Sequence, residues 1–477
     1  MSFRKIVLGT AAMSSANVLR LLAQFLVIPI ISRLLSPADY GVVAIAMPFI
    51  LFTMMFADAG VGRSLVRTPT GEKEIWSTCF WISAILGVIL ALVLIGLAPL
   101  AAQLFNEPRL SPIIMALAFV VIAQAISTIP GAALQQRHQF KIIAVMEITA
   151  LVLGMITAIV VALRGGGAWA LVDQQIAFYA VRVVMTFYFS PFFPLMVFDL
   201  KSVREHLIFG RDVIGVNIVG FLSRSLDNLI IGKVLGEAAV GLYSMAFQFA
   251  RLPMFLVTGP LQYVLYAQLA QVKDNILAIR HIYLLLVRLL SIVVFPVMGM
   301  IAVAHHPAFT LLLSEKWSAS GDLFMLAAPA CALQAITGLN GTIMMVLGRT
   351  DMQFRITVEF VLLWVISLLC VVLFGLSWVV IDFNIIVLLY TPRQLMLLLP
   401  LLSCSLMTFL RILLIPTFAA LVCVGMYWEI DHAMALGEWS QLIFAAILAV
   451  VGVGVSALTQ RRLLVNEINL CRNAFAS

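Results

Sequence analysis

The 477-residue sequence is poor in charge: 11% of its residues are Asp, Glu, Lys or Arg, whereas 63% are hydrophobic. Its mean hydropathy is +1.11. A soluble fold needs a far more polar surface, so an ordinary soluble protein is excluded. Apolar runs of about 20 residues, long enough to cross ~30 Å of hydrocarbon, recur along the whole length. The composition therefore predicts an all-α, polytopic membrane protein.

Signatures of catalysis and of metal binding are also missing. The six cysteines are scattered, mostly inside apolar runs, without paired or metal-ligand spacing. No HExxH, GxSxG, Walker A or CxxC pattern occurs, which argues against metalloproteases, serine hydrolases, ATPases and thiol oxidoreductases. The predicted loops are too short for the acidic or His/Arg clusters of a membrane glycosyltransferase or polymerase. We therefore expect no enzyme, no cofactor and no metal site.

We predict about fourteen transmembrane helices. Polar residues and a proline interrupt the twelfth, which leaves open whether residues 379–402 span the membrane or are partly re-entrant or interfacial. The predicted spans lie near residues 13–35, 40–62, 76–102, 112–134, 142–163, 168–194, 208–235, 240–266, 282–304, 322–347, 356–377, 379–402, 411–428 and 440–459.

Basic residues are distributed unequally among the connections between these spans. With Arg4 and Lys5 inside, the inside segments hold 18 basic residues and the outside connections hold 5. The positive-inside rule then places both termini in the cytoplasm. The net charge of +7 is a topology signal, and a nucleic-acid partner is not expected. The five outside residues are Arg33, Arg109, Arg164, Lys233 and Lys316.

The segment Asn17–Gly41 returns 200 residues later as Asn217–Gly241. Arg33 aligns with Lys233, and the closing glycines align with each other. Such a repeat predicts two six-helix lobes in the same orientation, followed by two further helices. We place the lobes at residues 1–200 and 201–402, and the last two helices with a cytoplasmic tail at 403–477. The aligned identities are Asn17, Leu22, Leu26, Ile30, Ile31, Leu35, Ala38 and Gly41.

Polar residues inside the spans are the candidate site. An arginine at the bilayer centre costs roughly 2.5–3.5 kcal/mol on insertion scales, so it normally faces the bundle interior or water. Asn17, Arg20 and Gln24 share one helix face by their spacing. In the seventh span the residues Asn217, Arg224, Asp227 and Asn228 also share a face. The two stripes predict a cationic cavity between the lobes.

Simpler explanations remain open for these residues. Arg224 can form a structural ion pair with Asp227, and Arg20 can pair with Asp58. Arg251 lies beside Gln248 and Pro253, where a proline kink frees backbone groups. The remaining intramembrane arginines, Arg182, Arg288 and Arg393, can snorkel or pair with Asp173, Glu147, Glu359 or Asp382.

The segment Arg33-Leu-Leu-Ser-Pro37-Ala-Asp39-Tyr40-Gly41 and its echo in Leu226–Pro253 carry a family resemblance. They resemble the motif of the polysaccharide-transporter family, the Wzx-type flippases of the multidrug/oligosaccharidyl-lipid/polysaccharide exporter superfamily. The resemblance covers the whole chain. It implies a V-shaped bundle of two six-helix lobes with two C-terminal helices in the bacterial inner membrane.

The resemblance also implies a function: alternating-access transfer of undecaprenyl-pyrophosphate-linked oligosaccharide from the cytoplasmic to the periplasmic leaflet, for exopolysaccharide or lipopolysaccharide biosynthesis. Membrane lipids, a polysaccharide polymerase and export machinery are the implied partners. Arginine suits a diphosphate because its fork donates charge-assisted hydrogen bonds in pairs. We expect substrate contacts from Asn17, Arg20, Gln24, Gln124, Arg224, Gln248 and Arg251, and ion coupling or ion pairing from Asp58 and Asp227.

Two other functions remain compatible with the sequence. An ion-coupled drug or cation antiporter of the same superfamily needs an unpaired carboxylate in a span. A non-transporting assembly protein of a polysaccharide complex needs neither that carboxylate nor the arginines. The candidate carboxylates for an antiporter are Asp58, Glu147, Asp173 and Glu359.

Overall fold

The structure is a computed structural model that describes residues 25, 27–58, 61–65, 73–199, 203, 218, 221, 225–269, 272, 275–434 and 436–476. Every regular element in these residues is helical. Ten helical stretches among them are long and apolar enough to cross a membrane. The predicted all-α membrane fold is thereby confirmed. The first and seventh predicted spans lie largely outside the described residues, so the total of fourteen stays a prediction.

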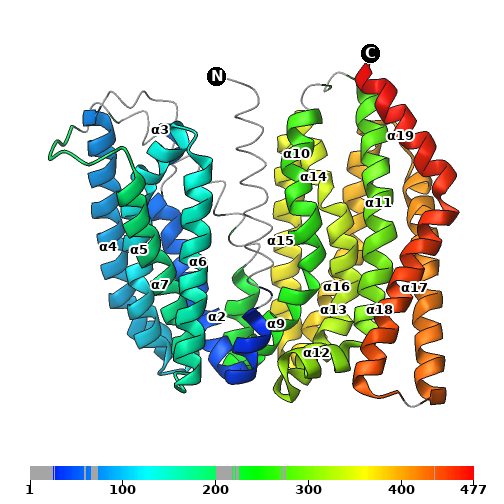
Figure 1. Cartoon of the computed structure of the whole chain (residues 1–477), viewed down its shortest axis with the longest axis horizontal. Helices are drawn as coiled ribbons and strands as arrows, with labels where there is room; N and C mark the ends of the chain where they lie inside the picture. Colours follow the sequence, from blue (N-terminus) through cyan, green and yellow to red (C-terminus); the bar gives the residue numbers. More distant parts are fainter. Residues whose placement is uncertain are drawn as a thin grey trace. The chain divides into compact units, whose positions relative to one another are not determined.

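The chain divides into two compact units, residues 1–241 and 242–477. The predicted lobe boundary near residue 200 falls in a stretch of which the structure describes little, and the predicted domain limits stay a prediction. The amino-terminal unit (Figure 1) contains α2 (Pro37–Asp58), α3 (Val61–Leu65), α4 (Lys73–Phe105), α5 (Leu110–Gln136), α6 (Phe140–Leu163), α7 (Trp169–Phe189), helical residues 225–235 and the first turn of α9 (Glu237–Ala250).

Helices α6 and α7 pack closely because α6 buries small residues at every fourth position, Ala150, Gly154, Ala158 and Ala162. A Cβ atom on Gly154 would lie 3.0 Å from the backbone oxygen of Gln174 in α7. Small residues allow helix backbones to approach and gain van der Waals contact where no hydrophobic effect operates. Several larger apolar side chains of α6, among them Val145, Ile156 and Leu163, remain exposed, as expected of a lipid-facing surface.

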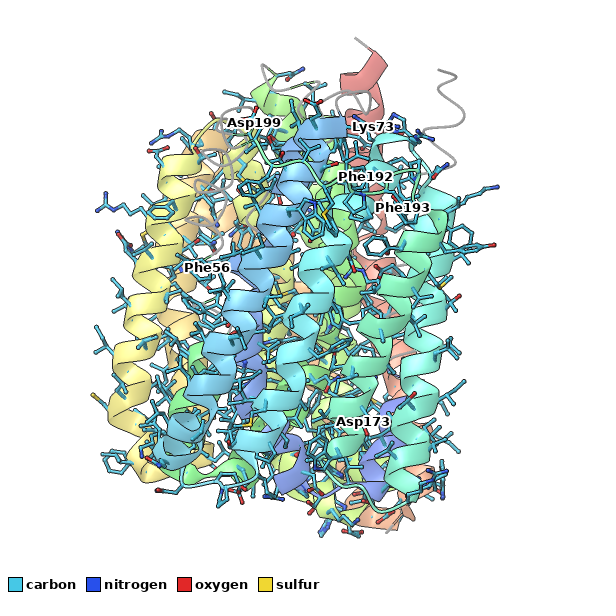
Figure 2. The ribbon with its side chains drawn as sticks, turned by 90° about the vertical axis from the view of Figure 1, so that its left-hand side faces the viewer. Phe56, Lys73, Asp173, Phe192, Phe193 and Asp199 are labelled. Atoms are coloured by element: carbon cyan, nitrogen blue, oxygen red, sulfur yellow. The ribbon has the colours of Figure 1, made fainter. Side chains whose placement is uncertain are left out.

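Residues 190–199, which follow α7, are held against the first turns of α4. Trp81 donates its indole N–H to the Leu195 carbonyl at 2.8 Å, and the Leu195 amide donates to Ser77 at 2.9 Å. The Asp199 amide donates to the Thr78 hydroxyl at 3.1 Å. Figure 2 shows Asp199 and the neighbouring Phe192 at the same end of the unit as Lys73. The segment after α7 is therefore anchored to α4 of the same unit.

The carboxy-terminal unit is arranged around α11, which contacts α13, α17, α18 and α19 (Figure 1). Its elements after α9 are a π-helix at Met254–Thr258, α10 (Gly259–Leu269), α11 (Ile276–Val303), α12 (His305–Leu313), a 3-10 turn at Glu315–Trp317, α13 (Ser318–Thr337), α14 (Leu339–Val346), α15 (Thr350–Val371), a 3-10 turn at Val372–Phe374, α16 (Leu376–Leu398), a 3-10 turn at Leu399–Leu402, α17 (Leu406–Met434), α18 (Glu438–Thr459) and α19 (Arg461–Ala476).

Helix α16 is continuous through Pro392, and the stretch Leu376–Leu402 is long enough to span a membrane. Its polar residues are satisfied by neighbouring helices. The Asn384 amide donates to Leu326 O at 2.8 Å and accepts from Ala330 N at 3.1 Å. It thus connects a donor and an acceptor of α13 next to Pro329, where a proline disturbs the helical hydrogen bonds. A continuous helix of this length fits the predicted twelfth span, and whether it crosses the membrane or lies at the interface stays a prediction.

Helix α19 occupies the region predicted as a plain tail, and it supplies the partner of Arg288 in α11. The Arg288 guanidinium donates to both carboxylate oxygens of Glu467, at 2.9 and 2.8 Å, and to Gln460 Oε1 at 2.5 Å. All four acidic partners considered for Arg288 were wrong. Arg288 is buried, so this bidentate contact compensates a charge that would otherwise lack water.

Candidate functional site

The predicted motif forms the start of α2. The Ser36 amide donates to Asp39 Oδ2 at 3.1 Å, while the Asp39 amide donates to Ser36 Oγ at 3.2 Å. Pro37 is the first residue of the helix, where its missing N–H has no cost. These reciprocal bonds are a capping box, which satisfies donors that a helix start leaves free. The Ser-Pro-x-Asp part of the motif is therefore explained by helix initiation.

The motif glycines bring the starts of α2 and α9 into backbone contact. A Cβ atom on Gly41 would lie 1.6 Å from Glu237 O, and one on Gly241 would lie 1.8 Å from Pro37 O. Gly241 and Glu237 are the repeat equivalents of Gly41 and Pro37, so the contact is reciprocal. The two copies of the motif therefore meet through equivalent residues.

Arg109, in the short connection between α4 and α5, lies among three carboxylates. Its Nε and Nη2 donate to Glu107 at 2.8 and 3.2 Å. Its Nη1 is 3.4 Å from Asp39 Oδ1, and Nη2 is 3.7 Å from Glu237 Oε1. We call these four residues the Arg109 cluster. All four belong to connections that the topology prediction places on the outside.

The hydrogen bond from Arg109 holds the pKa of Glu107 below its ordinary value of 4.5, although burial opposes this. The same hydrogen bond raises the pKa of Arg109. Because Glu107 occupies the guanidinium in a bidentate contact, the cluster is suited to fastening the helix ends together. A diphosphate would have to displace that carboxylate.

Most residues predicted to line a cationic cavity lie outside the described part of the chain. Asp227 is buried, and its Oδ1 accepts from the Asn228 backbone amide at 2.9 Å. Asp58 is the last residue of α2, with its side chain outside the described part. The other predicted residues outside the described part are Asn17, Arg20, Gln24, Asn217 and Arg224.

Gln248 lies in the last turn of α9, and Arg251 follows the end of that helix. The Arg251 guanidinium carbon is 4.9 Å from the centre of the Phe247 ring, a cation–π distance. The proline after it, Pro253, is followed by the π-helix Met254–Thr258. Such π-helical turns are rare in proteins, and those that occur are often found at functional sites. The predicted kink therefore exists, and Gln248 is half-buried one turn before it.

Gln124 is bonded to a residue that lines a polar pocket in the amino-terminal unit. Its Oε1 accepts from Arg182 Nη1 at 2.9 Å, and Arg182 Nε is 3.3 Å from Glu147 Oε1. Arg182 of α7 and Glu147 of α6, with residues of α5 such as Ser127 and Gln135, line a cavity of about 330 Å³, which we call the α5–α6–α7 pocket. Of the alternatives left open for the intramembrane arginines, the structure shows ion pairing for Arg182, with Glu147, and for Arg393, with Glu359 at 2.8 Å.

The sequence held a second repeat signal that the first alignment missed. Tyr179 precedes Arg182 by three residues in α7, and Tyr390 precedes Arg393 by three residues in α16. Gln-Ala-Ile-Ser at 124–127 in α5 likewise matches Gln-Ala-Ile-Thr at 334–337 in α13. The offsets are 211 and 210, so an alignment fixed at 200 hides both.

Known proteins resemble this chain in sequence and in fold. A family model described as polysaccharide biosynthesis protein matches residues 30–322. The lipopolysaccharide biosynthesis protein WzxC of Escherichia coli K12 is 24% identical over 337 residues, which cover 69% of this chain and 67% of WzxC. The succinoglycan biosynthesis transport protein ExoT of Rhizobium meliloti is 26% identical over 305 residues, 64% of this chain and 62% of ExoT.

The fold matches that of the lipid II flippase MurJ in an inward closed conformation, with a TM-score of 0.74 over 96% of this chain and 100% of MurJ at 13% identity. None of these three proteins is named for an enzymatic activity. Because the family model matches more than half of the chain and includes both copies of the motif, the chain belongs to this family of polysaccharide biosynthesis proteins, with the fold of the MurJ flippase.

Proposed function

We propose that this chain is a flippase that moves undecaprenyl-pyrophosphate-linked oligosaccharide units from the cytoplasmic to the periplasmic leaflet of the bacterial inner membrane. The observation that carries the proposal is the family match over residues 30–322, joined to a lipid-flippase fold over nearly the whole chain. The names of WzxC and ExoT, a lipopolysaccharide and a succinoglycan protein, support surface polysaccharide as the product.

The proposed substrate sets the chemistry of the path. Its head combines two negative charges with many hydroxyl groups, whereas its polyprenyl tail is soluble in the bilayer. Arg20 and Arg224 would bind the diphosphate through paired hydrogen bonds, assisted by Asn17, Gln24 and Arg251. Gln124 and Gln248 would contact sugar hydroxyls. Asp58 and Asp227 would balance these cations or couple transport to an ion.

Alternating access needs an outer end that can close and open. The reciprocal contact of Gly41 with Glu237, and of Gly241 with Pro37, would form the closed joint. The Arg109 cluster would fasten it. Arg109 is 47% exposed, and exposed ion pairs each contribute only about 0.2–1 kcal/mol. Contacts of this strength can break and re-form in each transport cycle.

The proposal is tested by deleting the gene in the producing bacterium. We expect undecaprenyl-linked oligosaccharide to accumulate with its sugar facing the cytoplasm, and surface polysaccharide to be lost. Arg20→Ala should reach the membrane at wild-type abundance without restoring export. Arg20→Lys should restore it in part, because an ammonium keeps the charge and loses the fork. A deletion strain that exports polysaccharide normally would contradict the proposal, and normal export by Arg20→Ala would remove this residue from it.

A further inference from the structure

Each unit contains one copy of the same polar arrangement. In the amino-terminal unit Tyr179 and Arg182 lie on α7 and Glu147 lies on α6. In the carboxy-terminal unit the corresponding residues are Tyr390 and Arg393 on α16 and Glu359 on α15. The two copies hold the same groups and differ in how these are bonded.

In the carboxy-terminal copy the carboxylate of Glu359 is saturated. Arg393 binds both oxygens of Glu359, with Nε at 2.8 Å and Nη2 at 2.9 Å. The same carboxylate also accepts from Tyr390 at 3.2 Å and from Arg355 at 2.9 Å. Four protein hydrogen bonds fill the acceptor sites of one carboxylate, so this copy is suited to holding α15 and α16 together.

The amino-terminal copy is open. Arg182 Nε faces Glu147 Oε1 at 3.3 Å, and Nη1 donates to Gln124. Among the described residues, no hydrogen bond or ion pair uses Arg182 Nη2 or Glu147 Oε2. The Arg182 and Glu147 side chains are 28% and 27% exposed. Within the described part of the chain, one donor group and one acceptor atom are therefore available to a ligand.

Arg182 and Glu147 both line the α5–α6–α7 pocket. Its volume of about 330 Å³ lies at the lower end of the range of small-molecule sites. Ser127, Gln135 and Thr186 add hydroxyl and amide groups, and Phe178 and Tyr179 add aromatic side chains. Glu147 balances the charge of Arg182, so the pocket does not favour a phosphate. A mixture of donors and acceptors without net charge fits a neutral, hydroxyl-rich molecule.

We propose that the α5–α6–α7 pocket is a subsite for a sugar residue of the transported oligosaccharide, and that the equivalent Arg393–Glu359 pair is a scaffold. The inference rests on the proposed function. It separates recognition of the sugar, by the amino-terminal unit, from recognition of the diphosphate, by the cationic residues proposed above.

The test compares two lipids on the purified full-length protein in lipid nanodiscs: undecaprenyl pyrophosphate, and the same carrier bearing the oligosaccharide of the producing strain. The variant Glu147→Gln with Arg182→Gln keeps the net charge and removes the pair. We expect it to bind the sugar-bearing lipid at least about tenfold more weakly and the bare carrier within about twofold of wild type. The matched control, Glu359→Gln with Arg393→Gln, should bind both lipids as wild type does.

A second variant guards against a folding defect. Gln135 is exposed at the pocket, so Gln135→Leu should keep the fold and weaken only the sugar-bearing lipid, about fivefold for one hydrogen bond. If both pocket variants bind the two lipids as wild type does, or lose both equally, the subsite is refuted. If the wild-type protein binds neither lipid, the flippase proposal itself fails, which is a distinguishable result.

Discussion

Gly41 and Gly241 are the residues for which the structure leaves least freedom. An alanine methyl at Gly41 would lie 1.6 Å from Glu237 O, which is backbone and cannot rotate away. Overpacking of this kind typically costs about 1–3 kcal/mol, and a backbone clash belongs at the upper end. We expect Gly41→Ala to lower the thermal unfolding midpoint of the detergent-purified protein markedly.

Gly96 in α4 provides the matched control, because a Cβ atom there would have no neighbour within 4 Å. Gly96→Ala should leave the midpoint unchanged or raise it slightly, since alanine favours the helix. Equal midpoints for Gly41→Ala and wild type would show that the two helix starts are not in contact as described.

At the residue scale the sequence predicted some contacts and missed others for physical reasons. Glu147 and Glu359 were among the four acids considered as partners of the intramembrane arginines, because few acids lie in the spans. The partner of Arg288 was missed because Glu467 lies outside them. The capping box was not predicted, although Ser-Pro-x-Asp is its pattern, and a motif does not state that Gly41 meets Glu237.

At the scale of elements, the Arg109 cluster joins the ends of α2, α4, α5 and α9. Replacing Arg109 with Gln should destabilise the protein at neutral pH, because Asp39, Glu107 and Glu237 then repel one another. The pKa of Glu107 is lowered by Arg109, so its stabilising contact is present above the ordinary value of 4.5 and is lost as the pH falls through the lower folded value. The difference in thermal unfolding midpoint between the wild type and Arg109→Gln should therefore be largest near neutral pH. It should decrease below about pH 4.5. A gap that stays constant from about pH 7 to about pH 4 would contradict this.

The buried ion pair between Arg288 and Glu467 joins helix α19 to α11. Removing one partner of such a pair typically costs about 3–5 kcal/mol, because the other charge stays buried alone. Glu467→Gln should thus lower the free energy of unfolding strongly, and combining it with Arg288→Met should recover most of the loss. The exposed pair Arg349–Asp351 is the control, and Asp351→Asn should change the midpoint little. A Glu467→Gln protein as stable as wild type would show that α19 is not held by Arg288.

The spanning helices were predictable because length and hydropathy decide them. Helix α19 was not, since its low hydropathy and its charges, as in Arg461 and Arg462, are typical of a solvated tail. Its amphipathic pattern was the available signal. Helix α16 was uncertain for a related reason. In the sequence Asn384 is a polar residue that disfavours a membrane span, and only the structure shows that α13 supplies its hydrogen-bond partners.

For the whole molecule, the repeat makes two halves with equivalent helices, for which we propose different tasks. The sequence predicted the repeat and the family, because both depend on local motifs. It did not predict that one copy of the Tyr/Arg/Glu arrangement is open and the other saturated, since that depends on distances across three helices.

The most direct measurement is lipid transfer in proteoliposomes that contain only the purified protein. Undecaprenyl-pyrophosphate-linked oligosaccharide is placed in one leaflet, and its sugar is assayed in the other with an impermeant glycosidase or lectin. A flippase predicts transfer well above that of protein-free liposomes and a loss of that excess with Arg20→Ala. No transfer above protein-free liposomes, by protein that is folded and binds the lipid, would contradict the proposed function.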